Sequence, residues 1–512
     1  MSETGKMRRN RCYTSPTGVA FFGVLVLLCL SSCKPPQPKA VPNPLSILIL
    51  CVDTLRADHT GLYGYHRPTT PNVDQFFSEG TVFNNAYSTA SYTTPAVFSL
   101  LTGLSPQQHG IRILYQQAYP ELDSLPRQLS RLGYQTAAIV SNQVLTAEAS
   151  ALDQHFDYYD DTMETPQNFS GLYERNAEGT TDAALRWLAA FRKPERPFLL
   201  YVHYMDPHDP YDPPDNKPVT FSHTGSLAFD PEEKVKDSMR RPGVTDALDY
   251  VDRYDEEIAY ADEQIGRLLK MLQEKGLLDS LLVIFCADHG ETLMEHEKWF
   301  RHSYHIYEEQ VRIPLAIRGP EFQKSRVDEL VSLLEIAPMI RSTIGLQENS
   351  PGRRDSLPPD CPWSNMLHVE SDLMLDVQWR GLVGADKKWM VALNHKDPEK
   401  KILDARHYDL AKDPGEQNPI RPEKKNLSEQ ILPQLLQLIQ SDPDLGRPYP
   451  VKLFAKGTRL TQPKGFLSAH PGLTEEQIRK LQAIGYLHDI QLPRFIPSPT
   501  PTPTAQPAQT QD

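Results

Sequence analysis

Two short apolar runs that end on ionisable residues constrain this chain more than any other feature. Residues 47–52 (ILILCV) lead into Asp53, and residues 281–287 (LLVIFCA) lead into Asp288 and His289. Apolar runs of this length, rich in β-branched residues, are typical of strands buried on both faces of a parallel sheet. Ligands bind outside the carboxyl ends of such strands. We therefore expect Asp53, Asp288 and His289 to converge there and to suit one divalent cation.

Short motifs follow one another in a characteristic order along the chain. They are DTLRAD (53–58), TTPAVFSLLTG (93–103), HYMDPHDPY (203–211), DHGE (288–291) and YEEQVRIPL (307–315). Their order resembles that of the sulfatase family within the alkaline phosphatase superfamily. The resemblance implies an α/β fold, an alkaline-phosphatase-like sandwich with a large, mostly parallel central sheet flanked by helices. It also implies a smaller C-terminal sheet subdomain.

The hydrophobic periodicity repeats strand and helix along the predicted catalytic region. It predicts strands over 135–140 and 198–202 and helices over 126–132, 181–191 and 258–272, with Thr181 as the cap of the second helix. A further strand is predicted at 389–393, in the smaller C-terminal subdomain. Alternation of this kind is typical of parallel α/β sheets.

Composition and resemblance divide the chain into six segments. They are a lipoprotein signal peptide (1–32), a Pro-rich tether (33–45), a sulfatase-like catalytic domain (46–346), a smaller C-terminal subdomain (347–440), an extension with a short helix at 473–481 (441–490) and a Pro/Thr tail (491–512). The tail is too polar and Pro-rich to build a core, so we expect it to be disordered.

The N-terminal segment has the features of a targeting signal. Basic residues precede the apolar run 19–30, which ends in Leu-Ser-Ser before Cys33. This pattern predicts a signal peptide with a lipobox, and lipidation of Cys33. The alternative is a plain membrane anchor, but the run is shorter than the roughly 20 apolar residues that a spanning helix needs. We expect a bacterial cell-envelope protein held to the membrane by lipid. An aspartate directly after the lipidated cysteine resembles an inner-membrane retention signal in Gram-negative lipoproteins. Here that position is Lys34, which favours the outer membrane.

Charge and cysteine content narrow the partners and the chemistry. Against 66 acidic residues there are 53 basic ones, and the net charge of −13 excludes nucleic acid as the main partner. Cys51 and Cys286 fall on the two predicted central strands. We expect buried free thiols, or a disulfide if the strands are neighbours with suitable geometry.

The resemblance assigns the nucleophile to the residue two positions before Pro95, at a helix start. This residue is Thr93, with Ser91 and Thr94 as less well-placed rivals. A hydroxyl there could ligate the cation, which would lower its pKa, and the helix N-terminus would favour an anionic group. The predicted metal ligands are therefore Asp53, Thr93, Asp288 and His289.

Thr93 is also where the chain departs from the family pattern. Sulfatases carry Cys or Ser in a Cys/Ser-x-Pro-Ser-Arg pattern, and its first residue is converted to formylglycine. Here the pattern begins with Thr93, and Val97 replaces the Arg, so no formylglycine is expected. The Gly-Lys-Trp-His string typical after the next strand is replaced by Ser-Asn-Gln at 141–143. A Thr nucleophile looks more like the superfamily's phosphodiesterases and phosphoryl-type transferases.

Further candidates surround the predicted centre. His208 and His302 are candidates to protonate the leaving group or to hold the nonbridging oxygens of the ester. The predicted substrate-binding residues are Arg56, Asn142 and His203. His203 could instead belong, with Asp206, to a second metal site.

Three functions fit this set. The first is a metal-dependent hydrolase of sulfate or phosphate esters in a small molecule, a glycan or a lipid. The second is a transferase of a phospho-substituent such as phosphoethanolamine, and the third is a noncatalytic binding protein on the same fold. The oxygen-rich ligand set favours Ca²⁺ or Mg²⁺, whereas the imidazole favours Mn²⁺ or Zn²⁺. The sequence leaves the metal, the substrate and the oligomeric state open.

Overall fold

The computed structural model describes part of the chain, which includes both apolar runs. The described residues are 44–163, 165–166, 173–214, 216–235, 239–296, 299–346, 366–372, 377–394, 402–423, 435 and 439. The signal peptide, Cys33, most of the tether, the expected helix at 473–481 and the tail lie outside them. Among the described residues, no helix combines the length and apolarity needed to cross a membrane.

A nine-stranded mixed sheet forms the centre of the catalytic region. Its strand order is β11-β2-β10-β8-β1-β7-β3-β4, and β9 pairs with β2 off this path. The strands are β1 (Ser46–Val52), β2 (Thr81–Tyr87), β3 (Gln135–Ile139), β4 (Tyr158–Asp160), β7 (Phe198–Tyr204), β8 (Leu281–Ala287), β9 (Arg312–Ile313), β10 (Leu315–Arg318) and β11 (Ser325–Ser332). The two predicted apolar runs are β1 and β8, and they pair directly and in parallel. The predicted mostly parallel central sheet is confirmed.

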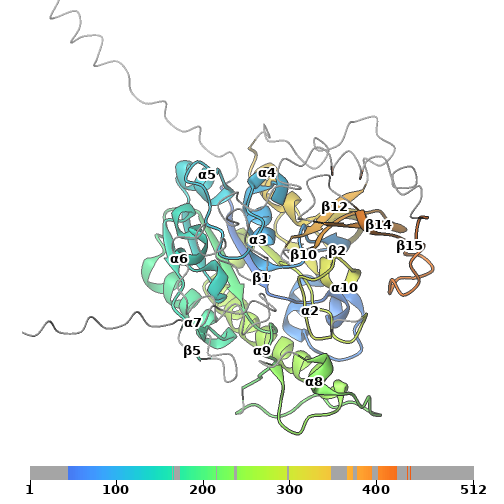
Figure 1. Ribbon diagram of the computed structural model, residues 1–512. Helices are drawn as coiled ribbons and strands as arrows, with labels where there is room; N and C mark the ends of the chain where they lie inside the picture. Colours follow the sequence, from blue (N-terminus) through green and yellow to red (C-terminus); the bar gives the residue numbers. More distant parts are fainter. Residues whose placement is uncertain are drawn as a thin grey trace, which may run out of the picture. The chain divides into compact units, whose positions relative to one another are not determined.

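Helices cover the sheet because its central strands are buried on both faces. Every residue of β7 and β8 is buried, as are residues 47–52 of β1. The long helix α9 (Ala247–Glu274) contacts α7 (Ala177–Arg186) and α2 (Pro71–Phe77). A second group surrounds α3 (Thr93–Thr102), which is buried along its whole length. Figure 1 shows α3 close to β1, with α9 below it in this view.

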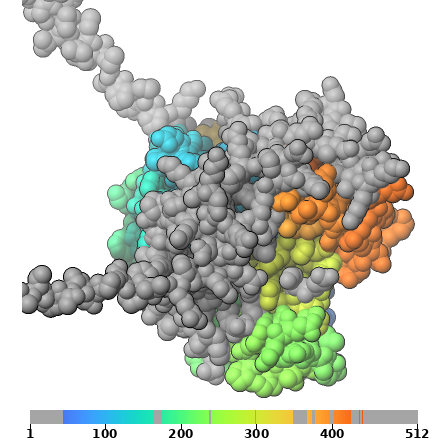
Figure 2. Space-filling view, viewed as in Figure 1, coloured from blue at the N-terminus to red at the C-terminus, as the bar shows by residue number. Residues whose placement is uncertain are grey.

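The other helices are shorter. They are α4 (Pro106–His109), α5 (Leu125–Arg131), α6 (Ala147–Ser150), α8 (Pro231–Lys234), α10 (Glu308–Val311) and α11 (Ile336–Thr343). One-turn helices lie at Ala57–His59, Gly61–Tyr63, Gln143–Leu145, Leu152–His155, Leu278–Ser280 and Leu333–Glu335, and a π-helical turn at Trp187–Phe191. The strands β5 (Thr165–Pro166) and β6 (Tyr173–Glu174) form a separate pair. α8 has no buried residue and belongs to the green surface region at the bottom of Figure 2.

Two helix starts differ from the prediction. α7 begins at Ala177 and not at Thr181, because the side chain of Asn176 accepts a hydrogen bond from the backbone N–H of Gly179. Asn is a strong N-cap residue. Thr181 is instead a buried residue within the helix, and its hydroxyl lies 2.9 Å from that of Tyr204. α9 begins at Ala247, where Asp246 caps it, well before the apolar stripe.

A four-stranded antiparallel sheet forms the smaller C-terminal part. Its order is β12-β13-β14-β15, with bounds Leu367–Ser371, Val377–Val383, Lys387–Asn394 and Ile402–Asp409. Its core includes Val369 and Met390 together with Ile306 and Val311 from the segment before β9. Figure 2 shows the orange C-terminal part beside the yellow part of the catalytic region. The predicted α/β fold with a smaller C-terminal sheet is confirmed.

Candidate active site

Two acidic side chains meet at the carboxyl end of the central sheet. β1 and β8 pair in register from Ser46 opposite Leu281 to Val52 opposite Ala287, so Asp53 and Asp288 leave neighbouring strands at the same level. Both are fully buried, as is His289. The Nε2 atom of His289 lies 3.4 Å from Asp53 Oδ1 and 3.6 Å from Asp288 Oδ2. The structure therefore brings together the three residues that the strand ends predicted.

Thr93 joins this group from the first residue of α3, as expected for a nucleophile at a helix start. Its Oγ1 lies 3.5 Å from Asp53 Oδ2 and 3.4 Å from His289 Nε2. Asn142, at the end of β3, donates from Nδ2 to Asp53 Oδ2 at 2.6 Å and lies 3.4 Å from Thr93 Oγ1. Ser91 and Thr94 are buried too, and their hydroxyls have no hydrogen-bond partner in the described part of the chain.

The donor set fits a cation. Nδ1 of His289 lies 2.9 Å from the Gly290 carbonyl O, which can only accept, so Nδ1 carries the hydrogen. In the neutral ring, Nε2 then presents a lone pair toward Asp53 and Thr93. Within the described residues, neither Asp53 Oδ1 nor Asp288 Oδ2 has a hydrogen-bond partner. Buried acceptors that face one another in this way repel unless a positive charge lies between them.

The electrostatics of the carboxylate pair are unequal. Burial, together with the charge of Asp288, raises the pKa of Asp53. Burial alone would also raise the pKa of Asp288, but its neighbours His289 and His203 lower it. The two carboxylates thus differ in how far the folded protein favours their charged form.

Three further predicted histidines lie around this centre. His203, on β7, places Nε2 3.8 Å from both Asp53 Oδ2 and Asp288 Oδ2. The centroid of the His302 ring lies 4.7 Å from the ring centroid of His289 and 4.9 Å from that of His208. Nδ1 of His208 lies 2.8 Å from the Asp209 carbonyl O, and its Nε2 has no hydrogen-bond partner in the described structure. Nδ1 of His302 lies 3.3 Å from Glu291 Oε2.

The turn after Asp53 takes Arg56 into a different set of contacts. Thr54 has a positive φ of 54°, and its carbonyl O accepts a hydrogen bond from the Tyr254 hydroxyl of α9. The Arg56 guanidinium forms ion pairs with Asp58 and Glu295, each at 2.8 Å. Its charge is therefore already compensated by two carboxylates, and its predicted contact with substrate stays a prediction.

Gly290 explains how the loop after β8 packs so closely. Its N–H donates to the Gln310 carbonyl O at 2.8 Å. A Cβ at this position would lie 2.1 Å from the Glu309 carbonyl O, which is closer than any contact allows. Only glycine can therefore follow His289 here while the segment carrying β9 stays in place.

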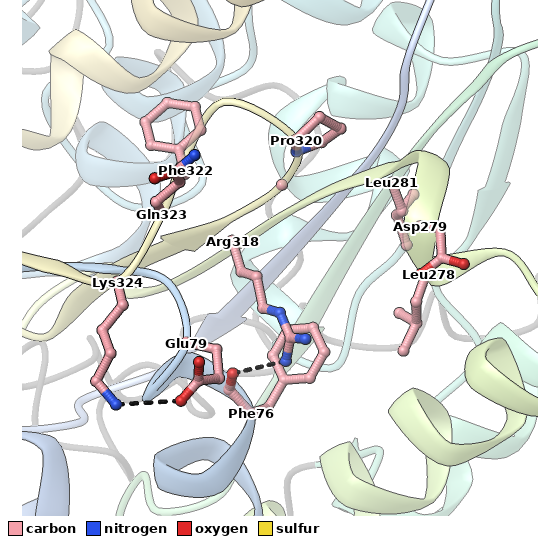
Figure 3. Close-up of a pocket in the computed structure, with 11 residues that line it drawn as sticks. Phe76, Glu79, Leu278, Asp279, Leu281, Arg318, Pro320, Phe322, Gln323 and Lys324 are labelled. Atoms are coloured by element: carbon pink, nitrogen blue, oxygen red, sulfur yellow. Dashed lines mark hydrogen bonds and ion pairs between the residues drawn. The ribbon is translucent and has the colours of Figure 1, made fainter.

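Two surface hollows are lined by residues other than the four predicted metal ligands. One, of about 400 Å³, is lined by Leu281, the first residue of β8, and so lies at the opposite end of this strand from Asp288. Figure 3 shows that its cations already have partners: Lys324 pairs with Glu79, and Arg318 lies 4.4 Å from the Phe76 ring centroid. The other, of about 410 Å³, is lined by Arg56 and several carboxylates.

Comparison with known proteins agrees with this geometry. A model of the sulfatase family matches residues 46–346, which include all four predicted metal ligands. The chain belongs to the sulfatase family. It is a sulfatase-like hydrolase, and it is 24% identical to an arylsulfatase of Clostridium perfringens over 438 residues, which cover 72% of this chain and 89% of the relative.

Solved structures place this sulfatase-family chain in the alkaline-phosphatase-like fold. One structure, determined in complex with its substrate D-glucosamine-2-N,6-O-disulfate, has a TM-score of 0.60 and 21% identity, and the match covers 79% of this chain and 99% of that one. The phosphonate monoester hydrolase of Agrobacterium radiobacter has a TM-score of 0.58 and 17% identity, with 77% and 95% covered. The fold predicted from the resemblance is thereby confirmed.

Sequence reasoning missed two residues beside the site of this sulfatase-family protein. Tyr254 bridges both sides of the turn after Asp53, since its hydroxyl also accepts from the Arg56 N–H at 3.0 Å. No local signal marks it, because it lies about 200 positions away on α9. Cys51 was expected to be a buried free thiol, which the structure confirms, or a disulfide partner of Cys286, but not a neighbour of the site. Its position two residues before Asp53 places both side chains on one face of the sheet.

Proposed function

We propose that this protein is a metal-dependent, sulfatase-family hydrolase that cleaves sulfate or phosphate esters with Thr93 as the nucleophile. The observation that carries the proposal is the position of the Thr93 hydroxyl. It lies within 3.5 Å of Asp53 Oδ2 and His289 Nε2, on the first residue of a fully buried helix. A hydroxyl becomes a competent nucleophile only beside a base or a cation, and this arrangement offers both.

The ligands of the cation would be Asp53, Thr93, Asp288 and His289. When bound, a divalent cation would stabilise the negative charge of the reacting group and lower the pKa of the Thr93 hydroxyl. Asn142 would hold Asp53 in place through its 2.6 Å hydrogen bond. Three oxygen ligands and one imidazole are compatible with Ca²⁺, Mg²⁺, Mn²⁺ or Zn²⁺.

The reaction would proceed in two displacements. The Thr93 hydroxyl loses its proton to solvent and its Oγ1 attacks the sulfur or phosphorus atom, the bond to the ester oxygen breaks, and the departing oxygen takes a proton from a histidine. Water then attacks the same atom and gives a proton back to that histidine, the bond to Thr93 breaks, and Thr93 Oγ1 regains a proton. The sum is ester plus water giving an alcohol plus sulfate or phosphate, or a phosphomonoester where the substrate is a phosphodiester.

His208 is the better placed of the two candidate acids. Its Nδ1 faces a backbone carbonyl and therefore carries a hydrogen, whereas its Nε2 has no hydrogen-bond partner in the described residues. His302 is oriented by Glu291 and lies between the rings of His208 and His289. We assign His302 to the nonbridging oxygens of the ester.

Two lines of support address the substrate. Similarity to a structure bound to a glucosamine disulfate favours a sulfated saccharide. Phosphate esters are the second candidate, because Thr93 and Val97 replace the residues that form formylglycine and grip sulfate. The fold is also shared with a phosphonate monoester hydrolase. We further propose that lipid on Cys33 holds the protein to a bacterial envelope membrane.

The test is turnover by the purified full-length chain on three substrates. Glucosamine-6-sulfate, a phosphomonoester and a phosphodiester are each offered with Ca²⁺, Mg²⁺, Mn²⁺ or Zn²⁺, beside the Thr93→Ala variant. Metal-dependent cleavage that is lost in Thr93→Ala supports the proposal, and the preferred ester decides the branch. Cleavage that survives Thr93→Ala refutes the nucleophile. Metal binding without turnover on any substrate favours the transferase or the binding protein.

A further inference from the structure

A row of side chains lies directly below the two carboxylates, on the same face of the sheet. In the registers of β1 with β8 and β7, Cys51 lies opposite both Cys286 and His203. Side chains two residues apart on a strand share a face. Cys51 therefore lies beneath Asp53 and Cys286 beneath Asp288. Three neighbouring strands thus carry two thiols and an imidazole one layer below the proposed active site.

One thiol and the imidazole of this row come close enough to Asp288 for the three to share one metal ion. Ligand atoms of Cys51, His203 and Asp288 all lie within 4.8 Å of one another, and all three residues are buried. His203 Nε2 is 3.8 Å from Asp288 Oδ2. In a tetrahedral zinc site with bonds of about 2.0–2.3 Å, neighbouring ligand atoms are separated by roughly 3.3–3.8 Å. The His203–Asp288 distance is at the upper end of this range and too long for a hydrogen bond.

An independent observation points to a missing ligand. His203 is fully buried, and neither of its ring nitrogens has a hydrogen-bond partner among the described residues. Asp288 Oδ2 likewise has none. Buried polar groups in native structures are almost always hydrogen-bonded or bound to an ion. A second cation would give one of the two His203 ring nitrogens a partner, and it would share Asp288 Oδ2 with the cation proposed above.

We propose that Cys51, His203 and Asp288 form a second metal site, for a thiophilic divalent ion such as Zn²⁺. A thiolate and an imidazole select such ions over Ca²⁺ and Mg²⁺. Binding would release the Cys51 thiol proton to solvent. Asp288 would be shared with the site above. Cys286 is not a ligand: it lies on the other side of Cys51 from His203, because β1 separates β7 from β8.

The inference goes beyond the proposed reaction and does not depend on Thr93. Co²⁺ is the probe, because a thiolate bound to Co²⁺ gives a charge-transfer absorption in the near ultraviolet that oxygen and nitrogen ligands do not. The metal-stripped, full-length chain is titrated with Co²⁺ under reducing conditions. We expect this band in the wild type and in Thr93→Ala, which separates the inference from the nucleophile assignment.

Two matched substitutions decide the ligand. Cys51→Ala and Cys286→Ala remove the same atoms from the same buried row, so their packing damage is comparable. We expect the band to disappear in Cys51→Ala and to persist in Cys286→Ala. Loss of a residue that only supports a metal ligand raises the Kd for the metal by about 10- to 100-fold. In His203→Ala we expect the Kd for Co²⁺ to rise by more than this, because a ligand itself is lost.

Three results would overturn the proposal. The first is absence of the band in the wild type. The second is a band that survives Cys51→Ala. The third is a Cys51–Cys286 disulfide in the protein isolated without reductant, which would show that the thiol pair serves as a cross-link. Peptide mapping before and after reduction detects this disulfide.

Discussion

Two buried polar clusters in this protein differ in whether neighbouring side chains compensate their charges. In the first, Asp53 Oδ1 and Asp288 Oδ2 have no hydrogen-bond partner in the described structure. In the second, Arg112 and Arg380 meet Asp372, with Arg112 Nη1 at 3.1 Å and Arg380 Nη2 at 2.9 Å from Asp372 Oδ2.

The second cluster balances itself. Glu370 lies 3.8 Å from each guanidinium, so two positive side chains face two negative ones. The cluster also links β12 to the active-site helix, because the Asp372 N–H donates to the hydroxyl of Tyr92, the residue before Thr93. Buried charges that compensate one another are structural, whereas an uncompensated pair calls for a ligand.

The largest effect should come from the proposed nucleophile. Thr93→Ala should lower turnover by at least about a thousandfold, because no other hydroxyl in the described part of the chain is held against both Asp53 and His289. Thr94→Ala is the matched control, since Thr94 is equally buried one residue further along α3, and it should retain most of the activity. Equal losses in both variants would show that packing, and not nucleophilicity, is at stake. Steady-state kinetics measures both.

The same chemical change should have opposite results in the two clusters. Asp372→Asn should destabilise the protein by about 3–5 kcal/mol, because it leaves two buried guanidinium groups without their shared partner. Asp53→Asn removes a carboxylate whose pKa is raised by burial and by the charge of Asp288, and should leave the metal-free protein at least as stable. Urea unfolding in the presence of a chelator measures both values. A large loss for Asp53→Asn under these conditions would contradict the comparison.

Metal should stabilise the first cluster only. At a metal concentration about 100-fold above Kd, binding should add about 2.7 kcal/mol to the free energy of unfolding. Asp53→Asn should remove most of this gain, since it takes away one of the two carboxylates. Thermal unfolding with and without chelator tests the prediction. An unchanged Tm on metal addition to the wild type would argue against a cation at this site.

In a third cluster, formed by Glu309, Glu295 and Glu416, a bound proton offsets part of the negative charge. Substitution in this cluster should have the smallest effect on the free energy of unfolding. Burial and the neighbouring Glu295 and Glu416 raise the pKa of Glu309 to about 8. The folded state therefore holds a proton that the unfolded chain releases above about pH 4.5. The free energy of unfolding should fall as the pH rises from about 5 to 8.

Substitution should remove this pH dependence. Glu309→Gln, which is neutral at every pH, should gain on the order of 2 kcal/mol over the wild type at pH 8 and little at pH 5. The exposed Glu321→Gln is the control and should leave the pH dependence unchanged. Urea titrations at both pH values provide the measurement, and parallel curves for Glu309→Gln and wild type would count against the raised pKa.

The sequence predicted the parts of the site that lie on strand ends. Asp53, Asp288 and His289 follow uninterrupted apolar strands, so local pattern was sufficient for them. Thr93 was assigned from the resemblance to the sulfatase family, in which the nucleophile lies two residues before a proline. The start of α7 was wrong because Asn176 outcompeted Thr181 as a cap. Tyr254 and the Cys51–His203 contact depend on strand order and helix packing, which local pattern does not encode.

The pairing of β1 with β8 has a consequence for motion. Seven consecutive residues of each strand are paired, and β1 is also bound to β7 on its other side. Amide hydrogens in this ladder are expected to exchange with solvent only when the whole domain unfolds. The spacing of Asp53 and Asp288 would then persist through every smaller fluctuation, so that loops around the site can open to admit a bulky ester while the two carboxylates stay in place.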